Sequence, residues 1–213
     1  MNRGAGACQY DLVAGIGKRI RCAAAAVSAA SVLLLGACET PISVQKLPEL
    51  TYGHLPSFRL DVATIEVESA YRPTMRPPDV EHLFPTPPAS ALRRWASDRL
   101  RAEGRAGTAR FVITEARVTE TRLAVDKGLA GVFKMQQSER YDAAIEASLE
   151  IFDDRGFRGA FAGARATRSR TLGEDASVNE RERVWFEIVE EVMELFDAEI
   201  EKNIRQHMGG YLR

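Results

Sequence analysis

The fold is decided by the stretch YDAAIEASLEIF, residues 141–152, in which apolar and polar side chains alternate. Every second position places an apolar side chain on the same face: Tyr141, Ala143, Ile145, Ala147, Leu149 and Ile151. A period of two is typical of a strand with one face on the core and one in water, as in antiparallel sheets. We therefore predict an antiparallel strand over residues 139–153.

Three more strands are predicted from the same kind of pattern. Residues 60–69 and 111–123 alternate before the first stretch. After it, the Asp-Asp-Arg-Gly sequence at 153–156 predicts a hairpin turn into a strand over residues 157–171. An alanine face lets a helix approach closely, so we predict that this strand lies beneath a helix, on the face made by Ala160, Ala162, Ala164 and Ala166.

A first helix is predicted to start near Thr86 or Ser90 and to end near Glu103. Its apolar face is formed by Leu92, Trp95, Ala96 and Leu100. Arginines crowd the remainder of its surface. These arginines are Arg93, Arg94, Arg99 and Arg101. They could bind phosphates, but the pattern is more typical of a solvated helix face.

A second helix begins with the capping-box pattern of Ser177 and Glu180 and is long and amphipathic. Trp185 and Phe196 are expected to cover the alanine face of the preceding strand. The apolar stripe consists of Val184, Trp185, Ile188, Val189, Val192, Leu195, Phe196, Ile200 and Ile204. The order of elements predicts an α+β fold, a two-layer sandwich of a four-stranded, mostly antiparallel sheet with two helices packed on one face.

The N-terminal segment carries a basic stretch and then an apolar run that ends in Leu35-Gly36-Ala37-Cys38. This resembles the lipobox of bacterial lipoproteins. The resemblance implies that a lipid is attached to the Cys38 thiol and that the chain is cut before it, whereas the alternative is an ordinary cleaved signal with a chance cysteine. We predict a signal peptide over residues 1–37, a lipid-anchored linker over 38–58 and one domain over 59–213.

The order of elements, together with the lipobox, resembles two groups of bacterial lipoproteins over residues 58–208. They are the lipopolysaccharide-assembly lipoprotein and the auxiliary lipoproteins of lipid-trafficking ABC systems. The matching features are Arg94-Trp95, Glu174 and the hairpin turn. The resemblance implies no catalytic centre, and Glu39 after the anchor resembles the sorting pattern for the outer membrane, on its periplasmic face.

The remaining residues give little sign of catalysis. The 29 basic and 30 acidic residues of the chain leave a net charge of about −4 after the signal is removed, which gives no reason to expect nucleic acid. His54, His82 and His207 lack metal-ligand spacing, and no cofactor other than the covalent lipid is expected. The leading hypothesis is a non-enzymatic accessory or assembly factor for a membrane complex. The alternatives are a lipid-binding carrier or chaperone with an acyl-chain pocket, and an unrecognised hydrolase.

Two groups of residues are candidates for contact with a partner or lipid. The first is an apolar run between two strands, which contains Leu129, Val132, Phe133 and Met135. These residues either cap the core or insert into a partner groove or a lipid leaflet. Arginines on strands could meet lipid phosphates, with Arg117, Arg165 and Arg168 as the candidates. The simpler interpretation is that these arginines pair across the sheet with Glu115, Glu120, Glu146 and Glu150.

Overall fold

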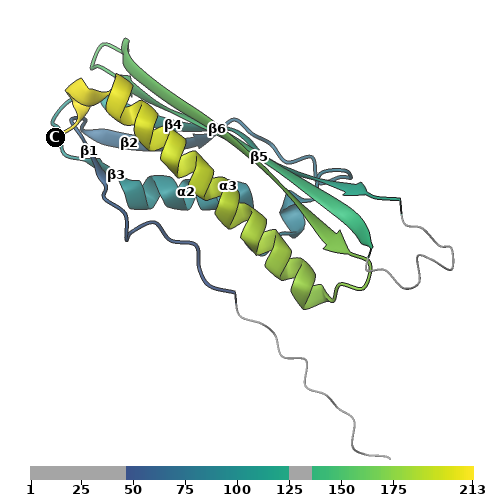
Figure 1. Cartoon of the computed structure of the whole chain (residues 1–213). Helices are drawn as coiled ribbons and strands as arrows, with labels where there is room; N and C mark the ends of the chain where they lie inside the picture. The colour runs from purple at the N-terminus through teal and green to yellow at the C-terminus, as the bar shows by residue number, and fades with distance from the viewer. Residues whose placement is uncertain (1–46, 125–135) are drawn as a thin grey trace, which may run out of the picture. The chain divides into compact units, whose positions relative to one another are not determined.

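The computed structural model describes residues 47–124 and 136–213, and its centre is one four-stranded sheet (Figure 1). The strands lie in the order β2-β4-β5-β6, with β2 parallel to β4 and the other neighbours antiparallel. Helices α2 and α3 pack on the sheet and on each other, which confirms the predicted α+β two-layer sandwich. The bounds are Thr64–Ser69 for β2, Pro88–Arg99 for α2, Thr108–Arg122 for β4, Gln137–Phe152 for β5, Arg158–Gly173 for β6 and Val178–His207 for α3.

Strand β5 has the predicted alternation, because all six of its apolar positions from Tyr141 to Ile151 are buried. Its neighbours continue the buried face, with Phe111 of β4, Leu149 of β5 and Ala162 of β6 in one cross-strand row. The predicted hairpin turn also forms. The Asp153 carboxylate accepts backbone hydrogen bonds from Arg155 and Phe157 at 2.9 and 2.8 Å, and Gly156 supplies the positive φ of 81° that the turn requires.

The core between sheet and helices is organised around aromatic rings. Trp95 of α2 stacks on Phe111 of β4 with 5.4 Å between ring centroids, and Phe196 of α3 meets both rings edge-on. These three rings come from the sheet and both helices, so the helices share one face of the sheet. Fully buried aromatic side chains contribute much of the apolar area that stabilises a domain of this size.

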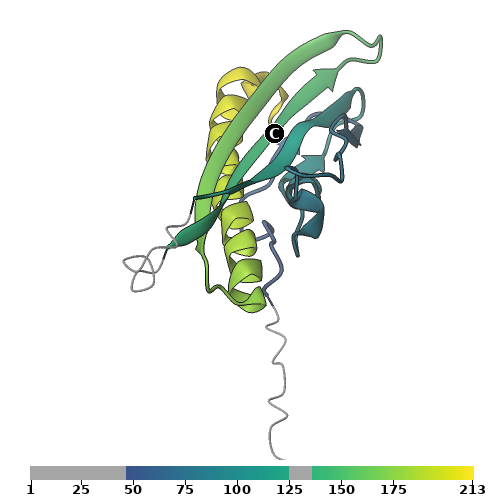
Figure 2. The same ribbon diagram turned by 90° about the vertical axis from the view of Figure 1, so that its right-hand side faces the viewer.

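Helix α3 starts with the predicted capping box, in which the Ser177 and Glu180 side chains each accept a hydrogen bond from the other's backbone N–H. It runs alongside β6 over the alanine face, where Ala162, Ala164 and Ala166 are buried (Figure 2). The predicted stripe is wrong at Leu195, whose side chain is 44% exposed. Phe186 and Met193 are buried in addition to the predicted set.

The ring contacts of Trp185 and Phe196 on α3 involve segments other than β6. The rings that Phe196 meets belong to α2 and β4. Trp185 stacks on Phe84 at 4.9 Å and meets Tyr141 of β5 edge-on. The ring contacts of α3 are therefore made with α2, β4, β5 and the segment that contains Phe84.

The first predicted strand, residues 60–69, is interrupted. It divides into β1, Phe58–Leu60, and β2, because the chain bends at Asp61 and the Ala63 N–H donates to the carbonyls of Ala106 and Gly107. Helix α2 likewise ends at Arg99 and not near Glu103. The chain then extends as β3, Leu100–Ala102, which pairs in parallel with β1.

The predicted linker, residues 38–58, is too long at its C-terminal end. Tyr52 is buried, its N–H donates to Asp98 Oδ2 of α2 at 2.9 Å, and Leu50 and Leu55 pack against the core. The described part of this segment from Leu50 onward therefore belongs to the domain. Its Pro, Gly and Ser content gave no periodic pattern from which this packing could be predicted.

The segment between β2 and α2 crosses the molecule as an irregular connection and packs closely against β4. The Val80 N–H donates to the Val118 carbonyl, and the Glu120 N–H donates to the Pro78 carbonyl, both at 2.9 Å. A short 3-10 turn, η1, covers Glu81–Leu83. The Pro77–Pro78 peptide bond in this segment is cis.

The C-terminal residues complete the small β1–β3 sheet. After the 3-10 turn η2, Gly209–Tyr211, Leu212 forms a bridge with Leu60. The Arg213 N–H donates to the Arg59 carbonyl at 2.9 Å, and its guanidinium lies 2.7 Å from Asp61 Oδ1. Residues at both ends of the domain are thus held together.

Candidate functional site

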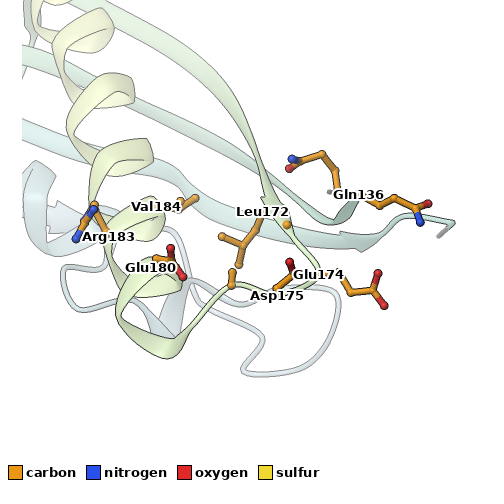
Figure 3. A pocket seen from close by; sticks show the side chains of 10 residues that line it. Gln136, Leu172, Glu174, Asp175, Glu180, Arg183 and Val184 are labelled. Carbon is orange, nitrogen blue, oxygen red and sulfur yellow. The ribbon is translucent and has the colours of Figure 1, made fainter. Parts of the chain in front are cut away.

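The structure has a pocket of about 470 Å³ at the end of the sheet where β6 passes into α3. Leu172 enters it from β6 and Val184 from α3, as Figure 3 shows, and Ala176 lies between them in sequence. These side chains make its apolar floor. Ligand sites of proteins have volumes of roughly 300–1,000 Å³, so the pocket is large enough for a small molecule or part of a chain.

Carboxylates dominate the rim of this pocket. Glu174, Asp175 and Glu180 stand there with one guanidinium, that of Arg183. The pKa of the Glu180 carboxyl is lowered, first by the hydrogen bond from the Ser177 backbone and then by the one from its hydroxyl. Because the rim has an excess of negative charge, it would repel a phosphate group and favour a cationic one.

A second concave surface lies between α3 and the outer edge of β6. This groove, also of about 470 Å³, is lined by Gly163–Thr167 of β6 and by Leu195, Glu199 and Asn203 of α3. The Asn203 side-chain amide donates to the Gly163 carbonyl at 2.7 Å and to Glu199 Oε1 at 3.2 Å. Leu195 is the exposed apolar side chain of the groove.

The arginines predicted as phosphate contacts all have carboxylate partners. Arg165 of β6 lies 3.1 Å from Glu115 of β4 and 3.7 Å from Glu146 of β5, which confirms the predicted cross-sheet pairing for this residue. Arg117 lies 3.4 Å from Glu115 of its own strand, so its pairing is not across the sheet. Arg168 pairs instead with Glu191 of α3, at 2.8 Å. Each exposed ion pair of this kind contributes less than about 1 kcal/mol to the free energy of unfolding. The contact of these arginines with lipid phosphates stays a prediction.

The other predicted site residues lie outside the described residues. This holds for the lipidation site, Cys38, and for the apolar run Leu129, Val132, Phe133 and Met135. Among the residues that the structure describes, no group of three His, Cys, Asp or Glu side chains is placed to hold a metal ion. Within the same ranges, no helix combines the length and apolar character needed to cross a membrane.

The expectation that Arg99 lies on a solvated helix face is wrong, because its side chain is completely buried. Its Nη2 donates to Glu201 Oε2 at 2.5 Å, its Nε lies 3.2 Å from Asp197 Oδ1, and its Nη1 donates to the Pro56 carbonyl. The guanidinium also lies over the Phe58 ring, with 4.6 Å between Arg99 Cζ and the ring centroid. We call Arg99, Asp197, Glu201 and the segment from Tyr52 to Phe58 the Arg99 cluster.

The Arg99 cluster joins the N-terminal segment to both helices. Trp95 Nε1 donates to the same Asp197 oxygen at 2.6 Å, which ties the aromatic core to the ion pairs. Burial, followed by the negative charge of Asp197, raises the pKa of the Tyr52 hydroxyl. A signal for the cluster was present in the sequence: Arg99 follows Leu92 by seven residues and Trp95 by four, so it lies on the apolar face of α2.

The pKa of Glu201 makes the stability of the Arg99 cluster dependent on pH. Burial raises this pKa, but hydrogen bonds from Arg205 and Arg99 outweigh burial and lower it below the usual 4.5. A lowered pKa in the folded state stabilises the fold above about pH 4.5, and the contribution is lost as the pH falls through the folded-state value. Glu201→Gln should therefore destabilise the protein at neutral pH, and the difference from the wild type should shrink in acid.

Urea unfolding of both proteins between about pH 7 and pH 3 measures this difference. Glu194→Gln on the same helix is a matched control, since Glu194 is exposed and forms no ion pair among the described residues. A difference between wild type and Glu201→Gln that stayed constant across this range would contradict the prediction.

No protein family model matches the sequence. No curated protein matches it significantly.

Proposed function

We propose that this protein is a lipid-anchored lipoprotein of the bacterial outer membrane, on its periplasmic face. Its domain would act as a non-enzymatic accessory or assembly factor for a membrane complex in lipid or lipopolysaccharide transport. The observation that carries the proposal is the sequence Leu35-Gly36-Ala37-Cys38 at the end of an apolar run. Each buried methylene of an attached acyl chain contributes about 0.8 kcal/mol to membrane binding, and two or more chains give stable anchoring.

The architecture supports a binding role for the domain. One face of the sheet is covered by both helices, while the other carries rows of paired charges such as Glu66, Arg110 and Glu150 across β2, β4 and β5. The paired charges make this face of the sheet polar. Exposed edges of sheets are common contact sites between proteins.

A lipid carrier is the second candidate, and the pocket at the end of the sheet is the observation that favours it. Its floor of Leu172, Val184 and Ala176 is apolar, as an acyl chain would require. Its rim of Glu174, Asp175 and Glu180 would repel the phosphates of phospholipid or lipopolysaccharide. The charge of the rim therefore makes this function the second choice.

The anchor is tested by changing Cys38 to serine and labelling cells with a palmitate analogue. The wild type should take up label and be found with membranes, whereas Cys38→Ser should take up none, because serine has no thiol to accept the lipid. Cys22→Ser is the matched control, since Cys22 lies in the predicted signal peptide and should leave labelling unchanged. Label retained by the Cys38→Ser protein would reject the anchor.

The accessory role is tested by purifying the tagged, lipidated protein from detergent-solubilised membranes and identifying the proteins that co-elute. Components of one lipid or lipopolysaccharide transport system should be enriched over an unrelated tagged lipoprotein from the same membrane. Equal recovery with both baits would mean that the domain does not bind such a complex.

A further inference from the structure

Strand β6 forms an open edge of the sheet. It pairs with β5 on one side, and the Asn203 side chain donates to the Gly163 carbonyl on the other. Residues along an antiparallel strand point their backbone groups alternately toward each side, so Arg165, Thr167 and Ser169 share the outward direction of Gly163. No backbone group of the described residues pairs with the outward groups of these three residues.

The groove beside this edge gives an added strand a place for its side chains. Side chains that pointed toward α3 would lie next to Ala164 and Ala166 and over Leu195. Leu195 is 44% exposed although it belongs to the apolar spacing of α3. An apolar side chain of the incoming strand would therefore cover a leucine that the fold itself leaves exposed.

The charge of the edge decides what kind of strand it would accept. Residues 155–173 contain no acidic residue and five arginines: Arg155, Arg158, Arg165, Arg168 and Arg170. Arg168 and Arg170 share a single carboxylate, that of Glu191, so one positive charge there is uncompensated. A second copy of β6 would bring arginines against arginines, whereas an acidic strand would be attracted.

We propose that the outer edge of β6, residues 163–169, binds an extended, acidic segment of a partner protein by strand addition. An apolar side chain of that segment lies over Leu195, and an acidic side chain on the same face lies beside Arg168 and Arg170. The proposal rests on the proposed function in one respect, that the partner of the domain is a protein. It names the surface and the chemistry of that contact.

The test uses the purified full-length protein in detergent and a short synthetic peptide, Thr-Leu-Thr-Glu-Thr-Glu-Thr, together with its reversed sequence. One of them should bind, and replacing its glutamates by lysines should weaken binding by at least about tenfold, or 1.4 kcal/mol. Binding is measured by calorimetry and by protection of the amides of Arg165 and Thr167 from hydrogen exchange. Absence of binding by both acidic peptides, or equal binding by the lysine peptides, would overturn the proposal.

Two variants locate the contact. Thr167→Pro removes an outward N–H and leaves the hydrogen bonds between β6 and β5 in place. Edge strands accept proline at such outward positions. Thr167→Ser is the matched control. Leu195→Asp changes the groove without altering the backbone of β6. Both Thr167→Pro and Leu195→Asp should weaken binding at least about tenfold, and Thr167→Ser should bind like the wild type. Unchanged binding by Leu195→Asp, or by a folded Thr167→Pro protein, would contradict the proposal.

Two further outcomes separate this proposal from other possibilities. A concentration-dependent dimer that Thr167→Pro abolishes would assign the edge to a second copy of the chain and overturn the acidic partner. Peptide binding concerns the edge alone, and palmitate labelling concerns the anchor alone. If the peptides did not bind but Cys38-dependent labelling were retained, the proposed function would stand without the edge contact. If the peptides bound but labelling were lost, the edge of β6 would remain a binding site without the lipid anchor.

Discussion

Replacing Phe196 with alanine is expected to lower the free energy of unfolding by about 3–5 kcal/mol, the range for aromatic side chains deleted from a core. Phe196 is completely buried and contacts the rings of Trp95 and Phe111, so its removal leaves a cavity where α2, α3 and β4 meet. Urea unfolding followed by tryptophan fluorescence measures the loss, because Trp95 lies 5.5 Å from the deleted ring.

Leu195→Ala is the matched control for this prediction. It removes an apolar side chain from the neighbouring position of the same helix, but the side chain is exposed, so the free energy of unfolding should change by no more than about 0.5 kcal/mol. Equal losses from the two variants would mean that α3 packs with a different face toward the sheet.

Replacing Arg99 with methionine is expected to cost about 3 kcal/mol of unfolding free energy. Methionine keeps most of the apolar stem but removes the charge that faces Asp197 and Glu201 and the donor to the Pro56 carbonyl. Breaking a buried ion pair by removing one partner costs about 3–5 kcal/mol, and the lower end applies because the carboxylate side chains are 18% and 32% exposed.

Arg93→Met provides the comparison, since Arg93 is an exposed arginine of the same helix with no ion pair among the described residues. It should change the free energy of unfolding by less than about 0.5 kcal/mol. If thermal melts gave the same small shift for both variants, Arg99 would have to be solvated and not enclosed by the N-terminal segment.

The parts of the fold predicted correctly are those in which one side-chain pattern determines one element. The alternation in β5, the Asp-Asp-Arg-Gly turn and the capping box at Ser177 each follow from local chemistry, and each is present in the structure. The order of these elements was then sufficient for the fold class. Leu195 shows where the same reasoning stops, because helical spacing gives a residue's face but not how far the neighbouring strand extends over it.

The parts that were missed depend on contacts between distant segments. The burial of Arg99 requires Pro56, Asp197 and Glu201, which lie 43 and about 100 residues away in the sequence. The division of the first strand depends on β3 and on Leu212 in the same way. Of the candidate site, the sequence predicted the cross-sheet partners of Arg165 but neither the pocket nor the groove, since both are formed by elements that meet only in the fold.

The closure of β1 by the C-terminal residues has a consequence for biosynthesis. The bridge from Leu60 to Leu212 and the bonds from Arg213 to Arg59 and Asp61 cannot form until position 213 has been synthesised. The small sheet that also holds β3 therefore stays incomplete while the chain is being made. Asp61 and Arg213 are 152 residues apart in the sequence, and contacts of such separation slow folding because a long loop must be closed to form them.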